Sequence, residues 1–225
     1  MKHIILAAAL VAFSSPVWAQ TPAPVQERAV TQMQAQPAKA PNMANAPEVA
    51  QAEAYLKQLK TGKARFLQTA GDGTQAIGTF YISRPGKLRF EYDPPVKDFV
   101  VADGFFIYFY DSQLQEQSNA PIGQTMADFL LRSDLKLSGD VEVTDISRGG
   151  NLIQITLVQT SDPLAGKLTL GFTPEPFALK KWRVTDAQGA ITEVELFQLQ
   201  TGVNLPSSLF VYSDPKKLEG RRLND

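Results

Sequence analysis

The stretch GTFYISRPGKLRFEY, from Gly78 to Tyr92, contains two alternating runs separated by an Arg-Pro-Gly turn at 84–86. In the second run, Leu88, Phe90 and Tyr92 are apolar, whereas the residues between them are charged. Successive side chains of a strand point to opposite faces, so this pattern indicates a strand with one apolar and one polar face. The stretch therefore predicts two neighbouring strands whose apolar side needs a cover.

Similar runs continue in both directions along the chain. We expect strands at 63–70, 75–83, 87–92, 97–101, 105–110, 113–118, 140–148, 151–159, 166–173, 178–185, 190–199 and 208–212. Short turn sequences, such as Ala102-Asp103-Gly104 and Asp186-Ala187-Gln188-Gly189, separate several of them. About ten antiparallel strands with few helices predict a mainly β fold of the α+β type. It is an incomplete barrel or strongly curved sheet, with short helices over its concave hydrophobic face.

Two segments have helical spacing. The first begins near Pro47 and places Val49, Ala52 and Leu56 on one face. The second runs from Pro121 to Arg132, with Asn119 as a possible cap. These helices either fill the concave side completely or leave an apolar cavity suited to acyl chains. The second helix could equally be a movable lid or an ordinary packing helix.

The N-terminus has the pattern of an exported protein. Residues 1–19 have a charged start, a short apolar run and the small-residue site Val17-Trp18-Ala19, which predicts a cleaved signal peptide and a periplasmic location. Residues 20–47 are rich in Pro, Ala and Gln and lack aromatic residues, which predicts a disordered leader. The remainder, 48–225, has the size of one domain.

Composition excludes several classes of function. The chain of 225 residues has no cysteine, and its one histidine, His3, lies in the predicted signal peptide. This excludes Ser-His-Asp and Cys-His nucleophiles and zinc sites with His or Cys ligands. The formal charge of -1 argues against nucleic-acid binding. No metal, phosphate or cofactor motif is present, and the pair Glu193 and Glu195 fits a solvated strand face better than acid–base catalysis. We therefore expect no enzyme, although chemistry based on carboxylates stays a third alternative.

Four parts of the chain together resemble a known family, the periplasmic outer-membrane lipoprotein carriers (LolA). They are Phe66-Leu67-Gln68 with the 78–92 stretch, Val101-Ala102-Asp103-Gly104 with the aromatic residues after it, the segment from Pro121 to Leu131, and Trp182–Gly189. The resemblance covers roughly 48–213. It implies an incomplete antiparallel barrel whose helices close a hydrophobic cavity.

The resemblance also implies a function. Such carriers receive acylated lipoproteins from an inner-membrane ABC transporter and deliver them across the periplasm to the outer membrane. A related periplasmic lipid-binding or lipoprotein-sensing module is the alternative. We expect a monomer without cofactor, metal or nucleic-acid partner. A lipid-anchored acceptor of the same fold would need a cysteine, which this chain lacks.

The resemblance further implies roles for individual residues. Arg84 matches the family arginine that hydrogen-bonds backbone carbonyls of the lid helix and couples lid opening to lipid release. Leu88 and Phe90 match positions on the cavity wall. The other candidates to contact lipid are Phe80 and Ile82 from the neighbouring strand and Leu56, Met126, Phe129 and Leu130 from the helices. All of them could instead be ordinary core residues.

Two features depart from the family pattern. The Pro-rich leader is additional, and the C-terminal sequence from Phe210 to Lys217 lacks the Pro-x-Gly and hydrophobic end of the longer carriers. In those carriers the C-terminal strand helps hand-over. The identity and even the presence of the usual outer-membrane acceptor are therefore left open, as are the cargo and the balance between open and closed lid.

Overall fold

A single sheet of 11 antiparallel strands forms the molecule in the computed structural model, which describes residues 43–215. The strand order is β6-β5-β4-β3-β2-β1-β11-β10-β9-β8-β7. The strands are β1 (Thr61–Ala70), β2 (Gln75–Ser83), β3 (Lys87–Tyr92), β4 (Phe99–Asp103), β5 (Phe106–Asp111), β6 (Glu116–Pro121), β7 (Val141–Gly149), β8 (Leu152–Gln159), β9 (Gly166–Pro174), β10 (Phe177–Asp186) and β11 (Ile191–Thr201).

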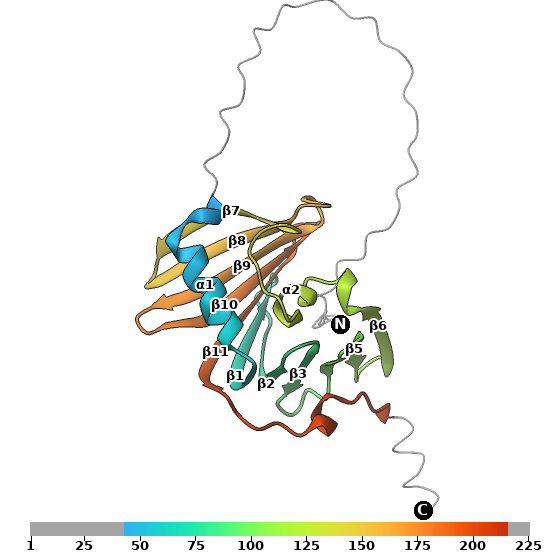
Figure 1. The fold of residues 1–225 in the computed structure, drawn as a ribbon. Helices are drawn as coiled ribbons and strands as arrows, with labels where there is room; N and C mark the ends of the chain where they lie inside the picture. The colour runs from blue at the N-terminus through green and yellow to red at the C-terminus, as the bar shows by residue number, and fades with distance from the viewer. Residues whose placement is uncertain (1–42, 216–225) are drawn as a thin grey trace, which may run out of the picture.

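The sheet is strongly curved and stays open (Figure 1). Strands β6 and β7 are its two edges and do not pair with each other, so the barrel is incomplete. Neighbouring strands are mostly consecutive in the chain, but β1 pairs with β11 and joins the two halves. The expected fold class is therefore confirmed.

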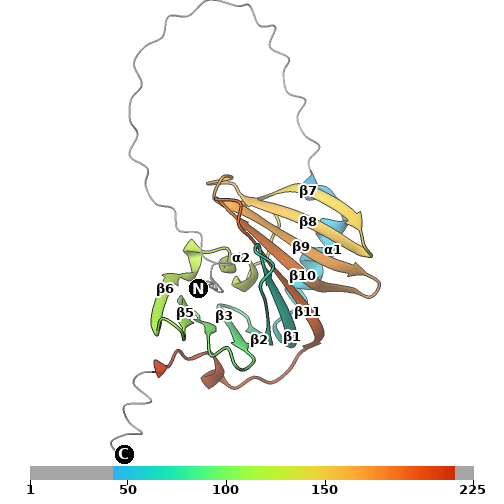
Figure 2. The ribbon, with the colours of Figure 1, turned by 180° about the vertical axis from the view of Figure 1, so that it is seen from behind.

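Helices cover the concave face only. Helix α1 (Pro47–Gln58) crosses the half formed by β7–β11, and α2 (Ala127–Leu131) lies in the opening between the two halves (Figure 1). Seen from behind, the outer face of the sheet carries neither helix (Figure 2). None of the helices among residues 43–215 is long and apolar enough to span a membrane.

Helix α1 begins at Pro47 as expected, because proline suits a first helical turn. Its face of Val49, Ala52 and Leu56 is fully buried. The ring of Tyr55 meets Phe172 and Phe177 edge-on, with centroid distances of 6.0 Å and 6.1 Å. These contacts fix α1 on β9 and β10.

The segment 121–132 differs from the prediction of one helix. Asn119 and Pro121 belong to β6, so Asn119 is not a helix cap. A 3₁₀ turn, η3 (Ile122–Gln124), follows, and α2 has only 5 residues. The backbone N–H of Ile122 donates to the carbonyl of Phe105, which keeps this stretch attached to the β4–β5 turn before α2 can begin.

The predicted strand at 208–212 is also wrong. Residues Ser207–Phe210 form a 3₁₀ turn, η4, which contacts β3 and β4 rather than extending the sheet. Phe210 is buried there, and the ring of Tyr212 stacks on Tyr108 at 4.7 Å. The C-terminal segment therefore contacts the sheet through side chains, where the sequence predicted a further hydrogen-bonded strand.

The predicted N-terminal boundaries lie mostly outside the described residues. This holds for the signal peptide at 1–19 and for most of the leader at 20–47. The last part of that leader is described, and Met43–Asn45 forms a 3₁₀ turn, η2. Met43 and Ala46 pack against the core, so ordered structure begins before residue 48.

Candidate functional site

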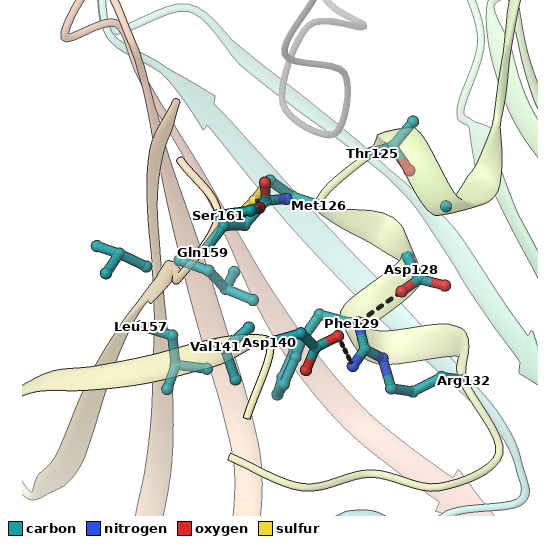
Figure 3. A pocket seen from close by; sticks show the side chains of 13 residues that line it. Thr125, Met126, Asp128, Phe129, Arg132, Asp140, Val141, Leu157, Gln159 and Ser161 are labelled. Carbon is teal, nitrogen blue, oxygen red and sulfur yellow. Dashed lines mark hydrogen bonds and ion pairs between the residues drawn. The ribbon is translucent and has the colours of Figure 1, made fainter. Parts of the chain in front are cut away.

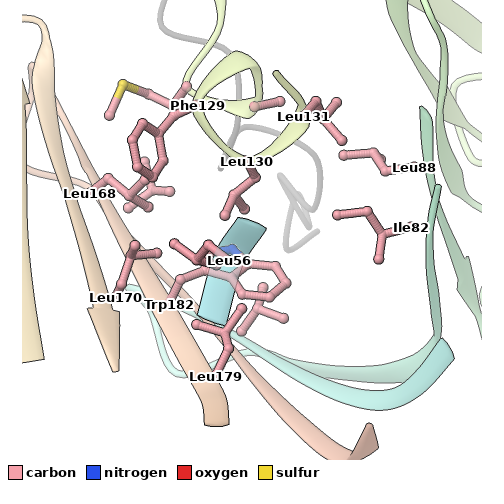
Figure 4. Close-up of a cluster of buried hydrophobic side chains, with 14 of the residues drawn as sticks. Leu56, Ile82, Leu88, Phe129, Leu130, Leu131, Leu168, Leu170, Leu179 and Trp182 are labelled. Atoms are coloured by element: carbon pink, nitrogen blue, oxygen red, sulfur yellow. The ribbon is translucent and has the colours of Figure 1, made fainter. Parts of the chain in front are cut away.

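Helix α2 closes the concave face with three successive apolar side chains, Phe129, Leu130 and Leu131 (Figure 4). They spread in different directions: Phe129 lies near Leu168 of β9, and Leu131 lies near Leu88 of β3. All three are buried. One five-residue helix therefore fills the space between the two halves of the sheet.

The structure brings all eight predicted lipid-contacting residues into one continuous core. Each is buried, with at most 6% of its surface exposed. Four come from β2 and β3 and four from the helical segments: Phe80, Ile82, Leu88 and Phe90, and Leu56, Met126, Phe129 and Leu130. Their shared location fits a cavity wall and a lid, and it equally fits an ordinary core.

Trp182 of β10 is a central member of this core that the candidate set omitted. Its ring lies 5.5 Å from Phe80 and 6.2 Å from Phe90, centroid to centroid. Only 1% of Trp182 is exposed. Its alternation with Val184 on β10 could have indicated an inward side chain, because both positions face the same side of a strand.

The apolar side chains of the concave face named above are buried in this conformation. A pocket of about 130 Å³ lies at the margin between α2 and strands β7 and β8 (Figure 3). Small-molecule sites usually enclose roughly 300–1,000 Å³, so this pocket is too small for a whole acyl chain. The small size of this pocket agrees with helices that fill the concave face, the first of the two alternatives that the sequence left open. Entry of a whole acyl chain at this pocket would require α2 to move.

Arg84 lies at the turn between β2 and β3, close to the end of α2. Its backbone N–H donates to the carbonyl of Lys60 at 2.8 Å. Its side-chain atoms Nε and Nη2 are buried and have no hydrogen-bond partner among the described residues. Burial lowers the pKa of the Arg84 guanidinium to about 10, and the nearby Tyr55 opposes this decrease. The group still carries its charge at neutral pH.

The backbone of this turn makes the contact that was expected from the arginine side chain. The N–H of Gly86 donates to the carbonyl of Leu131, the last residue of α2, at 2.8 Å. Gly86 has a φ of +77°, and a Cβ at this position would lie 2.8 Å from the Cα of Gly104. Glycine is therefore required both for the conformation and for the close packing of the two turns.

A second arginine, which sequence reasoning missed, connects α2 to the other half of the sheet. Arg132 forms ion pairs with Asp128 in α2 and with Asp140, which immediately precedes β7 (Figure 3). The spacing of Asp128 and Arg132 is the helical i, i+4 spacing, which is a recognisable signal. Nothing in the sequence indicated the second partner.

The two carboxylates considered for catalysis are engaged in ion pairs. Glu193 accepts hydrogen bonds from Lys181 at 3.1 Å and from Arg183 at 2.7 Å, and Glu195 pairs with Lys180 at 3.2 Å. Among residues 43–215, no cluster of three or more His, Asp or Glu side chains could hold a metal ion. This arrangement offers no evident acid–base pair.

Comparisons with known proteins agree with this architecture. A family model described as "Outer membrane lipoprotein carrier protein LolA" matches residues 57–213. The chain is 27% identical over 171 residues to an outer-membrane lipoprotein carrier protein of Methylococcus capsulatus, covering 72% of this chain and 82% of that protein. A protein of the same name from Chromobacterium violaceum is 28% identical over 184 residues, covering 78% and 88% of the two chains. A third, from Dechloromonas aromatica, is 29% identical with the same coverage.

Proposed function

Because this chain belongs to the LolA family of outer membrane lipoprotein carrier proteins, we propose that it carries acylated lipoproteins through the periplasm. It would take them from an inner-membrane ABC transporter, shelter their acyl chains under α1 and α2, and release them at the outer membrane. The observation that supports this most is the cover of the concave face. It is an apolar surface covered by two helices, α1 and the five-residue α2, instead of by a second sheet.

The physical requirement for such a shelter is clear. Burial of an acyl chain contributes about 0.8 kcal/mol per CH₂, so a lipoprotein does not leave a membrane for water without an apolar site to receive it. In the closed state, Phe129, Leu130 and Leu131 occupy this site themselves. Their contacts with the sheet compete with the lipid and lower its net affinity, which favours release at the next acceptor.

Arg84 is our candidate for the switch. Its buried, unpaired Nε and Nη2 atoms disfavour the closed state, because a buried donor without a partner costs about 1–3 kcal/mol. Movement of α2 would expose these donors to water or to carbonyl groups of the lipid. The open state would thereby gain the interactions that the closed state lacks, and the two states would lie close in free energy.

A transfer assay tests the proposal. The protein is loaded with a labelled lipoprotein from inner-membrane vesicles and then mixed with outer-membrane vesicles. We expect Arg84→Leu to take up less lipoprotein and therefore to transfer less of it, because loss of the two unpaired donors favours the closed state. Lys136→Leu is the control, because it changes an exposed cation outside the apolar core under α1 and α2. If the unmodified protein binds lipoprotein without delivering it, the lipid-binding or sensing module becomes the better description.

A further inference from the structure

The pocket between α2 and the β7–β8 edge combines an apolar floor with a polar rim (Figure 3). Phe129, Leu157 and Leu168 line its floor and also belong to the main core. The apolar lining of the pocket is therefore part of the same core that α1 and α2 cover. Gln159 and Arg132 contribute to its rim. An amphiphile with a hydrocarbon chain and a carbonyl-bearing head has the complementary chemistry.

Besides the apolar packing of Phe129, two polar side-chain contacts join the α2 segment to this edge. The ion pair of Arg132 with Asp140 spans the gap, and the amide of Gln159 contacts the sulfur of Met126 at 3.5 Å. The Asp140 side chain is 61% exposed, and ion pairs in such settings contribute only about 0.2–1 kcal/mol. These side-chain contacts can therefore separate at low cost.

The opposite margin of the α2 segment is held by the backbone. The N–H of Gly86 donates to Leu131 at 2.8 Å, and the N–H of Ile122 donates to Phe105 at 3.0 Å. Separation there would leave backbone groups without their partners, which is costly wherever water is excluded. The α2 segment should therefore separate first from β7 and β8 and turn about its attachment to the β2–β3 and β4–β5 turns.

The rim also contains a donor that has no partner. Arg132 Nε is buried and makes no hydrogen bond among the described residues, although the guanidinium pairs with Asp128 and Asp140 through its other nitrogens. Buried donors of this kind are uncommon in folded proteins. An ester or amide carbonyl at the head of an acyl chain could accept from Nε once Asp140 is released.

We infer that this pocket is the portal through which an acyl chain enters the apolar core under α1 and α2. The ion pair between Arg132 and Asp140 holds this portal closed. The inference rests on the proposed function, since it concerns how the same lipid reaches the same interior. It adds the side on which the α2 segment opens and the residue pair that controls the opening.

The role of the ion pair between Arg132 and Asp140 is tested by the rate of lipid uptake. Asp140→Asn removes the pair across the gap but leaves the pair of Arg132 with Asp128 within α2. With a synthetic triacylated lipopeptide as the probe, we expect Asp140→Asn to accelerate uptake about 1.4- to fivefold, the range that corresponds to one exposed ion pair. Asp134→Asn is the matched control, because Asp134 pairs with Lys136 at the surface. An equal rate in the two variants would overturn the inference.

The location is tested with a polarity-sensitive dye. The chain has no cysteine, so Ser161→Cys at the pocket rim and Ser118→Cys on the far edge strand β6 can each be labelled at one site. We expect lipopeptide to shift the emission at 161 and not at 118. A response at 118 alone would overturn the portal but leave the carrier function intact, provided that native mass spectrometry shows bound lipopeptide. Absence of any bound lipopeptide would overturn both.

Discussion

The backbone N–H of Gly86 donates a 2.8 Å hydrogen bond to the carbonyl of Leu131 and thereby joins the β2–β3 turn to the end of α2. A helix leaves its last carbonyls without intrahelical partners, and this bond satisfies one of them. The glycine is needed because the turn also packs against Gly104. The β2–β3 turn therefore helps to position α2 over the core.

Gly86→Ala should destabilise the protein more than the same change elsewhere. The alanine would face both a positive φ and a contact of 2.8 Å with Gly104, so we expect a loss of about 2–4 kcal/mol in the free energy of unfolding. Gly73→Ala is the control, because its φ is +82° but a Cβ there would meet nothing within 4 Å. Its expected loss is about 1 kcal/mol. Equal losses in urea unfolding would show that the packing of the two turns does not matter.

Arg84→Leu should stabilise the closed protein. It removes a buried charge with two unpaired donors, and we expect the free energy of unfolding to rise by about 1–3 kcal/mol. Arg84→Lys keeps a buried charge and should bring no such gain. Chemical denaturation of the lipid-free protein measures both. A lower stability of Arg84→Leu would mean that the guanidinium has favourable partners in solution, which contradicts its role in destabilising the closed state.

Glu193 should stabilise the sheet in a pH-dependent manner. Burial raises its pKa, but the hydrogen bonds from Lys181 and Arg183 outweigh burial and hold the pKa below the ordinary value of 4.5. Because the folded-state pKa is the lower one, the contribution of Glu193 is complete above pH 4.5 and is lost as the pH falls through the folded-state value. Unfolding of the parent protein and Glu193→Gln at a series of pH values measures this contribution.

The stability difference between the parent and Glu193→Gln should be largest near pH 7 and should shrink as the pH falls below 4.5. Glu142→Gln is the control, since Glu142 is an exposed residue of β7. The stability difference should change more with pH for Glu193→Gln than for Glu142→Gln, because Glu193 is the residue held by ion pairs. A difference for Glu193→Gln that does not change with pH would contradict the contribution of its ion pairs.

Tyr212 tests how the C-terminal segment is held. Its ring stacks on Tyr108 at 4.7 Å and lies 5.9 Å from Phe99. Its hydroxyl is buried and has no hydrogen-bond partner within residues 43–215. Tyr212→Ala should lower the free energy of unfolding by about 1–2 kcal/mol because the ring contacts are lost. Tyr212→Phe keeps the ring and removes the unpaired hydroxyl, so its stability should stay equal or rise by about 1 kcal/mol. A loss in Tyr212→Phe comparable to that in Tyr212→Ala would show that the hydroxyl has a partner.

Much of the sheet could be predicted because alternation is a local property. Leu88 and Phe90 face the core and Arg89 does not, as their spacing indicated. The errors fell on segments whose conformation depends on distant partners. Asn119 lies in β6 because that strand pairs with β5, and 207–210 turns as η4 because its contacts are with β3 and β4.

The sequence by itself determined which residues face the core, where most strands turn and, through its resemblance, to which family the chain is similar. Only the tertiary structure decided that Arg84 has two unpaired donors, that Gly86 holds Leu131 and that Arg132 reaches Asp140 across the open side of the sheet. The physical reason is that alternation and turn preference act between neighbours along the chain. Hydrogen bonding, charge pairing and burial depend instead on which segments the curved sheet and its helices bring together in space.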